Sequence, residues 1–388
     1  MSRNRIGDES GAIRTAGQER ACVTVKTSAS YPVWIGRGLL SAAGELAAER
    51  KSLCKAALIS DQTTGSLFED TVAQSLREAG FTTIGMRIPA GETSKNMTQL
   101  SAVLEFLAAN RLDRSDLIVA LGGGVVGDLA GFAAAVYLRG IDYIQIPTTF
   151  LAAIDSSVGG KTAVDLAAGK NLAGAFHQPI AVICDCDVFR TLPAATFADG
   201  AAEAVKYGVL TGGELFEDLA AGCGGRQGLP EEILPRIVEQ CVKIKADIVE
   251  RDEFDQGERQ LLNLGHTIGH AIEQCSHFRI SHGQAVAAGM AIMARSCECA
   301  GLAGAGTAAR IEAALKTQAL PIGCAYTAAE LARAASADKK RAGKYIQIVE
   351  PIQIGACRIR KVETAELFFI IEQGLSGGER GTERNSVK

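Results

Sequence analysis

The sequence lacks a long apolar run, and its charges nearly balance. The longest apolar window, residues 285–294, is too short and too rich in alanine to span a bilayer. The net charge of −4 gives no reason to expect nucleic acid as a partner. The first twenty residues contain no apolar stretch, and Asp8 and Glu9 argue against a transit peptide. We therefore expect a cytoplasmic protein that binds neither nucleic acid nor membranes.

The eleven cysteines contain no CxxC pair, and their number is odd. This pattern is not that of a disulfide framework. It suits a reducing compartment in which most thiols serve as small apolar side chains.

The chain of 388 residues is too long for one compact core, so two domains are expected. Short β-branched runs such as AALIS and LIVAL alternate with amphipathic stretches between residues 20 and 190. This alternation predicts a Rossmann-like α/β domain, with a mainly parallel sheet covered on both faces. Residues 191–374 read as a mostly α-helical domain, in which 345–362 predict one short hairpin. The polar tails, 1–19 and 375–388, are expected to be disordered.

A strand, a glycine turn and a helix follow one another in LIVALGGGVVGDLAGFAAAV. Gly122, Gly124 and Gly127 match G-x-G-x-x-G, a pattern that lets the backbone approach a pyrophosphate at a helix N-terminus. A tight turn without a ligand explains the same glycines, and the motif lies late for a first Rossmann unit. The ligand-binding interpretation is favoured by Asp61 and by the threonines of IPTT (146–149), which end other strands, because ligands gather at such ends.

The segment DSSVGGKTAVDLAAGKN, residues 155–171, places Lys161 and Lys170 directly after glycines. Such turns can direct backbone N–H groups and a lysine at a phosphate. The segment is not a P-loop, because Gly-x4-Gly-Lys is absent. A flexible surface loop with solvated lysines is the alternative.

Four of the five histidines lie between residues 266 and 282. His266 and His270 have the i,i+4 spacing that chelates zinc in HExxH helices. A lone histidine on an apolar helix is usually a core residue, but the clustering favours a functional site. The spacing gives His266, His270 and His282 as candidate metal ligands, with Glu203 as a fourth. It does not decide which of them are ligands and which are acid/base groups.

Two further residues extend this histidine pattern. If one helix runs through residues 259–270, Arg259 and Asn263 share a face with His266 and His270. His277 has no partner at helical spacing, so we expect it to be incidental.

Together, these motifs resemble the 3-dehydroquinate synthase family. The resemblance is collinear over roughly residues 22–370 and rests on GETSK, GGGVVGDLAGF, IPTTFLA, DSSVGGKT, GKNLAGAF, AEAVKYG, LLNLGHTIGHAIE and HGQAVAAGM. It implies an NAD-binding α/β domain over residues 20–190 and a helical metal- and substrate-binding domain over 191–374. It also implies a homodimer.

The implied reaction converts 3-deoxy-D-arabino-heptulosonate 7-phosphate to 3-dehydroquinate and phosphate, in the shikimate pathway of aromatic amino acid biosynthesis. NAD would oxidise an alcohol, phosphate would be eliminated, and the ketone would be reduced again before an intramolecular aldol closure. The cofactors would be NAD and a divalent metal, zinc or cobalt.

The resemblance also implies roles for particular residues. The metal ligands would be Glu203, His266 and His282, with His270 as a substrate-contacting acid/base group. The other catalytic residues would be Asp155, Lys161, Lys206 and Asp255. Substrate would be held by Asn171, Lys245, Arg259, Leu262, Asn263, a lysine of the pair Lys339 and Lys340, and Arg139 of the partner subunit. NAD would be held by Asp61, Glu92, Lys95, Gly123, Gly124, Asp128, Thr148, Thr149, Lys170 and Thr191.

Three positions depart from the family pattern, in which glutamate is common at each: Thr196, Asp255 and Gln284. The alternatives are therefore another sugar-phosphate cyclase, such as an aminodehydroquinate or 2-deoxy-scyllo-inosose synthase, or a metal-dependent alcohol or glycerol dehydrogenase. A non-catalytic ligand-binding homologue is a third. The intact SSVGGKT motif and the carboxylate-binding pair Lys245 and Arg259 favour the dehydroquinate reaction.

Overall fold

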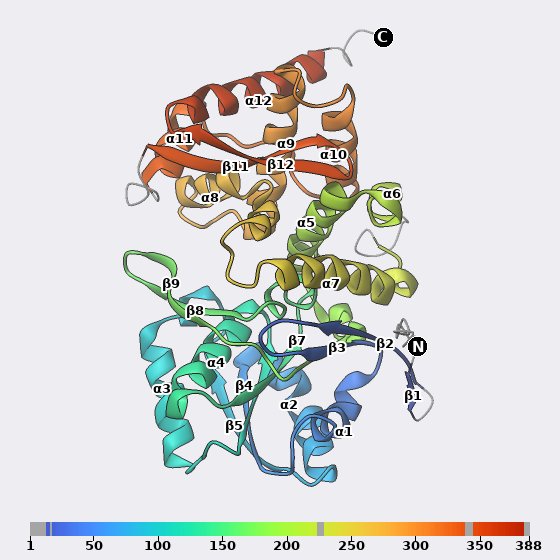
Figure 1. Cartoon of the computed structure of the whole chain (residues 1–388), viewed down its shortest axis with the longest axis vertical. Helices are drawn as coiled ribbons and strands as arrows, with labels where there is room; N and C mark the ends of the chain where they lie inside the picture. Colours follow the sequence, from blue (N-terminus) through green and yellow to red (C-terminus); the bar gives the residue numbers. More distant parts are fainter. Residues whose placement is uncertain (1–12, 16–17, 223–228, 338–343, 384–388) are drawn as a thin grey trace, which may run out of the picture. The chain divides into compact units, whose positions relative to one another are not determined.

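A computed structural model of the chain describes residues 13–15, 18–222, 229–337 and 344–383. The chain divides into two compact units (Figure 1). Unit 1 contains residues up to Thr191 together with Lys245–Glu253, and unit 2 contains Leu192–Ile244 and the chain from Phe254 onward. Helix α7 (Leu234–Arg251) contributes to both units. The predicted division into two consecutive domains does not capture this helix.

Unit 1 is built on an eight-stranded sheet in the order β1-β2-β3-β10-β7-β6-β4-β5. The pairs from β3 to β5 are parallel, whereas β1 and β2 pair in antiparallel fashion at one edge. The strands are β1 (Ile13–Thr15), β2 (Gln18–Val25), β3 (Tyr31–Gly36), β4 (Lys55–Asp61), β5 (Thr82–Ile88), β6 (Leu117–Gly122), β7 (Asp142–Pro147) and β10 (Ala181–Asp185). The predicted α/β fold with a mainly parallel sheet is confirmed.

Helices cover both faces of this sheet (Figure 1). On one face, α3 (Met97–Ala109) and α4 (Gly124–Val136) share a buried cluster with side chains of β4 and β6. On the other lie α1 (Ala43–Ala48) and α2 (Gln62–Glu78). Every residue of β6 is buried, as expected of a parallel strand that is covered twice.

The lysine-containing segment forms an antiparallel hairpin of β8 (Lys161–Leu166) and β9 (Gly169–Phe176), which the sequence did not predict. Gly159 and Gly160 precede it with φ of 94° and 68°, values that favour glycine. An isolated bridge between Asn96 and Asp165 ties the hairpin to the chain just after GETSK.

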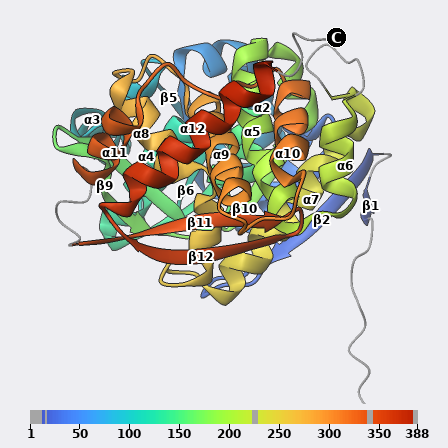
Figure 2. The same cartoon turned by 90° about the horizontal axis from the view of Figure 1, so that it is seen from above.

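Unit 2 is mostly helical, and α9 (His282–Cys299) is buried along most of its length. Its other elements are α5 (Ala194–Thr211), α6 (Gly213–Ala221), α8 (His266–Cys275), α10 (Thr307–Thr317), α11 (Ala328–Ala337), α12 (Glu366–Glu383), β11 (Tyr345–Gln353) and β12 (Ala356–Glu363). Helices α8, α9, α11 and α12 pack with the β11–β12 hairpin around one buried cluster (Figure 2). The predicted hairpin over 345–362 is confirmed. No helix in the described parts of the chain is long and apolar enough to cross a bilayer.

The structure differs from the sequence expectations in two respects. Helix α12 continues to Glu383, and β1 and the start of β2 lie within residues 1–19, so each of the two segments that were expected to be disordered contains regular structure. Residues 259–270 do not form one helix, because a 3-10 helix (Glu258–Asn263) ends before Gly265 and α8 begins only at His266. Gly265 has φ 80°, and a Cβ there would lie 2.6 Å from the carbonyl oxygen of Val286 on α9. The chain turns at Gly265 so that α8 can pack against α9.

This close approach makes Gly265→Ala strongly destabilising. A left-handed alanine costs about 1–2 kcal/mol, and overpacking adds about 1–3 kcal/mol. Gly301→Ala is the matched control, because Gly301 has φ 68° but nothing lies within 4 Å of the place that its Cβ would occupy. Denaturant unfolding should show a clearly larger loss for Gly265→Ala, and equal losses would contradict the importance of this packing.

Candidate metal centre and cofactor-binding residues

Three candidate metal ligands meet in unit 2, each from a different helix. Glu203 comes from α5, and His266 and His282 are the first residues of α8 and α9. The Nε2 atoms of the two histidines each lie 3.4 Å from Oε1 of Glu203. One ligand atom from each residue lies within 4.8 Å of the others. One carboxylate oxygen and two imidazole nitrogens form the donor set of a catalytic zinc site, so these residues fit a divalent metal.

Close helix packing brings these ligands together. A Cβ on Gly269 would lie 3.0 Å from the Cα of Val286, and one on Gly289 would lie 2.9 Å from the backbone nitrogen of Gly269. The two glycines therefore let α8 and α9 approach closely enough for the rings of His266 and His282 to lie 5.2 Å apart.

Glu203 is fully buried, with none of its surface exposed to solvent. Burial of a carboxylate costs several kcal/mol unless positive charge compensates for it. Lys206, one helical turn along α5 and 1% exposed, forms an ion pair with it. The amino group of Lys206 also lies 5.0 Å from the ring centroid of Tyr207. Within this cluster the Glu203 carboxylate therefore has a lysine ammonium group and two imidazoles as its neighbours.

The two histidines differ in their electrostatics. Burial lowers the pKa of His266 to about 3, so its imidazole is neutral and its lone pair is available to a metal. Burial also opposes the charged form of His282, but hydrogen bonds and charge from Glu203 and Glu273 outweigh it and raise the pKa to about 10.

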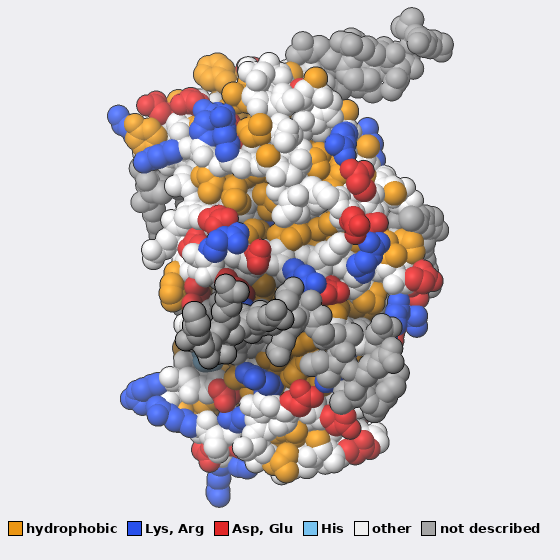
Figure 3. Space-filling view, turned by 45° about the vertical axis from the view of Figure 1, so that its right-hand side comes forward, with side chains coloured by type: hydrophobic (Ala, Val, Ile, Leu, Met, Phe, Trp, Pro, Cys, Tyr) orange, Lys and Arg blue, Asp and Glu red, His pale blue; other side chains and the backbone are white. Residues whose placement is uncertain are grey.

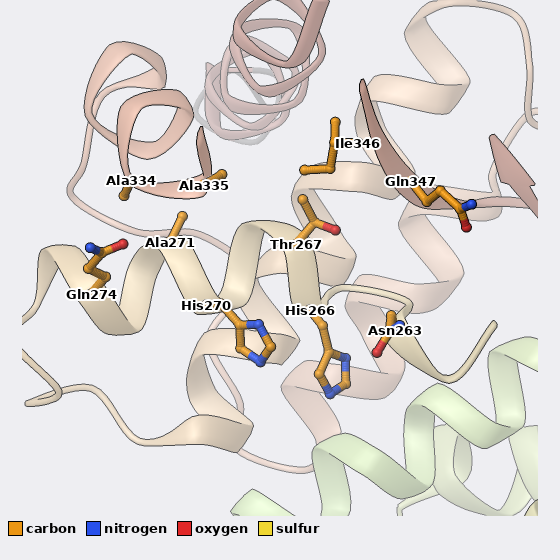
Figure 4. Close-up of a pocket in the computed structure, with 10 residues that line it drawn as sticks. All are labelled: Asn263, His266, Thr267, His270, Ala271, Gln274, Ala334, Ala335, Ile346 and Gln347. Carbon is orange, nitrogen blue, oxygen red and sulfur yellow. The ribbon is translucent and has the colours of Figure 1, made fainter. Parts of the chain in front are cut away.

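His270 lies one turn after His266, and both rings project from the same side of α8 (Figure 4). Its Nε2 is 4.0 Å from Oε2 of Glu273, and its side chain is 53% exposed. His270 belongs with Glu273 and His282 to a second group of possible ligands, and not to the group that contains Glu203. It also lines a cavity of about 200 Å³ together with Asn263 and His266 (Figure 4). The arrangement suits a group that contacts a ligand beside the metal.

Glu273 also belongs to this centre, although it was not among the residues predicted from the sequence. It is 5% exposed and lies 3.5 Å from Nδ1 of His282. Its spacing could have indicated it, because it follows His270 by three residues and His266 by seven, on the same helix face. A carboxylate beside the second nitrogen of a ligating imidazole fixes its orientation.

In unit 1 the glycine turn lies beside the threonines that follow the neighbouring strand. Gly123 precedes α4, and a Cβ there would lie 3.0 Å from Cγ2 of Thr149. The backbone N–H of Thr148 donates to the carbonyl of Gly122. Asp61 ends β4 and caps α2, accepting from the backbone N–H groups of residues 63 and 64 at 2.8 and 2.9 Å.

Lys95 connects three of the predicted motifs. Its Nζ lies 2.5 Å from Oδ2 of Asp128 on α4 and donates to Oδ1 of Asn171 at 2.6 Å. Glu92 pairs with Lys170 of the β8–β9 hairpin at 3.3 Å. The GETSK, glycine-turn and GKN segments are therefore one ion-paired network in this unit.

Asp155 and Lys245 form a second pair in unit 1. Asp155 lies in a short π-helix (Ala152–Ser156), and Lys245 reaches it from α7. The Lys245 amino group donates to the carbonyl oxygen of Asp155 at 2.5 Å and also to its carboxylate. Lys245 is buried, so this segment of α7 carries a predicted substrate residue into the α/β unit.

The remaining predicted residues differ in how exposed they are. Within unit 2, Arg259 and Leu262 are buried in the 3-10 helix before Gly265, Asn263 is exposed, and Asp255 has φ 58°. In unit 1, Lys161, Arg139 and Thr191 are exposed. Lys339 and Lys340 lie outside the described residues.

The fold and the ligand cluster define a class of proteins with a parallel α/β unit and a helical unit that carries a candidate metal centre. Solved structures with this fold include 2-deoxy-scyllo-inosose synthase in complex with carbaglucose-6-phosphate, NAD+ and Co2+, with a TM-score of 0.81, 24% identity, and coverage of 92% of this chain and 100% of that one. The 2-epi-5-epi-valiolone synthase of Streptomyces hygroscopicus has a TM-score of 0.82 at 24% identity, covering 92% and 99%. These two likenesses show the fold alone.

Sequence comparison identifies the family. Family profiles described as 3-dehydroquinate synthase N-terminal and C-terminal match residues 85–199 and 200–341. The 3-dehydroquinate synthase of Caulobacter vibrioides is 44% identical over 356 residues, which cover 89% of this chain and 96% of that protein. That of Clostridium acetobutylicum is 41% identical over 341 residues, covering 87% and 95%. The chain belongs to the 3-dehydroquinate synthase family, which confirms the resemblance.

Because a proton and a metal compete for Nε2 of His282, metal binding should release a proton. His266 is neutral above about pH 3, whereas His282 is protonated below about pH 10. Metal affinity should therefore rise about tenfold per pH unit between pH 6 and 8, since binding displaces one proton. Calorimetry in buffers of different ionisation enthalpy measures the released proton. An affinity that is independent of pH would contradict this competition.

Proposed function

We propose that the chain is an NAD-dependent phosphate lyase and cyclase that converts 3-deoxy-D-arabino-heptulosonate 7-phosphate to 3-dehydroquinate and phosphate. The observation that carries this proposal is the Glu203–His266–His282 cluster around a buried carboxylate, with Lys206, in a chain 41–44% identical to 3-dehydroquinate synthases over most of its length. The reaction belongs to the shikimate pathway, so the substrate is a phosphorylated sugar acid.

The proposed cofactors are NAD and a divalent metal, zinc or cobalt. When bound, NAD supplies a hydride acceptor and donor, and the metal polarises a substrate hydroxyl. Support comes from the ligand cluster and from the 24%-identical cyclases whose structures contain NAD+ with Co2+ or Zn2+. Most of the proposed NAD contacts belong to the strand ends of unit 1 or to the Lys95 network, and these are Asp61, Glu92, Lys95, Gly123, Gly124, Asp128, Thr148, Thr149 and Lys170. Thr191, the remaining proposed contact, ends a 3-10 helix (Cys186–Thr191).

The substrate-binding residues suit the groups of a phosphorylated sugar acid. Arg259 offers a planar fork for a carboxylate, with Lys245 as a second cation. Lys161 and Asn171 would hold the phosphate, and His270 would move a proton beside it.

The neighbouring hydroxyls of the substrate would be oriented by Lys206, Asp155 and Asn263. Asp255 and Leu262 are assigned to the site from their positions in the family pattern. These assignments follow motif positions, and except for Leu262 the ionic or polar character of each side chain supports them.

We also propose a homodimer in which Arg139 contacts the partner's substrate. Leu138 and Arg139 have φ of 51° and 69°, a strained pair in a short 3-10 helix (Tyr137–Arg139). Two hydrogen bonds from Arg114, at 3.0 and 2.8 Å, hold the carbonyl of Leu138. Strain held in place at an exposed arginine supports a functional position.

We also propose that the enzyme is cytoplasmic and has no nucleic-acid partner. The described cysteines are free thiols. On the face that Figure 3 shows, Lys and Arg side chains are interspersed with Asp and Glu side chains. Mixed charge of this kind gives no support to binding of a polyanion.

A direct assay tests the proposed reaction. Full-length protein with NAD, zinc or cobalt and the heptulosonate phosphate should release phosphate and 3-dehydroquinate in equal amounts, without net NADH. Glu203→Gln should abolish turnover, whereas His277→Ala should retain it, because His277 lies outside both groups of possible ligands. Absence of phosphate release, or stoichiometric NADH formation with glycerol, would reject the proposal.

A further inference from the structure

Helix α9 begins at a proposed metal ligand, but its own N-cap residue does not cap it. Ser281 occupies the N-cap position, and its side chain accepts no hydrogen bond from the helix. The hydroxyl instead donates to Oδ1 of Asp199 on α5, at 2.5 Å. Serine at this position normally accepts from the first N–H groups of a helix, whereas the Ser281 hydroxyl here joins α9 to α5.

Asp199, on the neighbouring helix α5, lies at this helix start. Burial raises the pKa of the Asp199 carboxyl, and the Ser281 hydroxyl and the nearby backbone N–H groups of Gln284 and Gly283 oppose that rise. A negative charge at this place also interacts favourably with the positive end of the helix dipole. Asp199 therefore holds the start of α9 through the Ser281 hydroxyl and places its charge beside the first N–H groups of the helix.

Asp199 and a proposed metal ligand share one face of α5. Asp199 precedes Glu203 by four residues, so the two carboxylates lie one helical turn apart. Gly283 lies directly against the α5 backbone, since a Cβ there would come 2.7 Å from the carbonyl carbon of Asp199. The residue between this contact and the cap serine is His282. Contacts of the two flanking residues, Ser281 and Gly283, thus fix the backbone of His282 relative to Glu203.

We propose that Asp199 is a positioning residue, which fixes the start of α9 on α5 so that His282 and Glu203 can bind one metal ion. It contacts neither the metal nor the substrate in this role. The role goes beyond the reaction itself, although it rests on the proposed ligand set Glu203, His266 and His282.

The test compares metal binding in full-length variants. Asp199→Ala should lower the affinity for zinc or Co(II) about 10–100-fold, the range found when residues behind metal ligands are removed. Asp199→Asn keeps an acceptor oxygen for the Ser281 hydroxyl, and should restore most of the affinity. Chelator competition measures the affinity, and the visible absorption of the Co(II) protein reports the ligand geometry independently of activity.

Glu298→Ala is the matched control. Glu298 lies on α9 and caps a neighbouring helix, since it accepts from the N–H groups of Gly306 and Ala308 at 2.9 Å each, at the start of α10. Its loss should also lower thermal stability, because a carboxylate at a helix start is removed in each case. Its metal affinity and Co(II) spectrum should not change.

Wild-type affinity in Asp199→Ala, or an equal loss of affinity in Glu298→Ala, would overturn the positioning role. If Asp199→Ala does not fold, Ser281→Ala removes only the serine hydrogen bond. It should show a smaller loss of affinity with a shifted Co(II) spectrum, and an unchanged affinity and spectrum would overturn the role as well. His282→Ala distinguishes a wrong ligand set from a wrong positioning role. If His282→Ala retains metal, the ligand set is rejected. If His282→Ala loses metal but Asp199→Ala binds it with wild-type affinity, only the positioning role is rejected.

Discussion

The burial of the Glu203 carboxylate is the constraint on which the helical unit depends. A fully buried carboxylate is stable only where positive charge or hydrogen-bond donors face it. Lys206 provides one such charge from the same helix, and His266 and His282 bring imidazoles from two others. Three helices must therefore meet at one point, and their packing follows from that requirement.

Glycines and helix caps satisfy this requirement by controlling how closely the helices approach. Gly265, Gly269 and Gly289 leave room for α8 against α9, so the histidines that begin these helices face one carboxylate. In the α/β unit, ion pairs have a comparable effect, because Lys95 links the glycine-turn helix to the β8–β9 hairpin. Both units thus use residues that are distant in sequence to hold charged side chains at defined positions.

Features set by local pattern could be predicted from the sequence. Buried strands such as β6 read as continuous apolar runs, and the clustered histidines indicated a site before any contact was known. The turn at Gly265 could not be predicted, since it depends on the approach of α9, which begins 17 residues later. Asp199 was missed for the same reason, because it acts through a tertiary contact and belongs to no motif that stands out by itself. Glu273 was missed although its spacing from His266 and His270 indicated it, because its contact with His282 comes from another helix.

X-ray absorption fine structure of the zinc-loaded full-length protein tests the central claim most directly. We predict nitrogen and oxygen ligands at about 2.0–2.2 Å, two imidazoles and no sulfur. The spectrum should be the same in His270→Ala, whereas His282→Ala should not retain zinc. A third imidazole that disappears in His270→Ala, or a sulfur ligand, would contradict the assignment of Glu203, His266 and His282 as the metal centre.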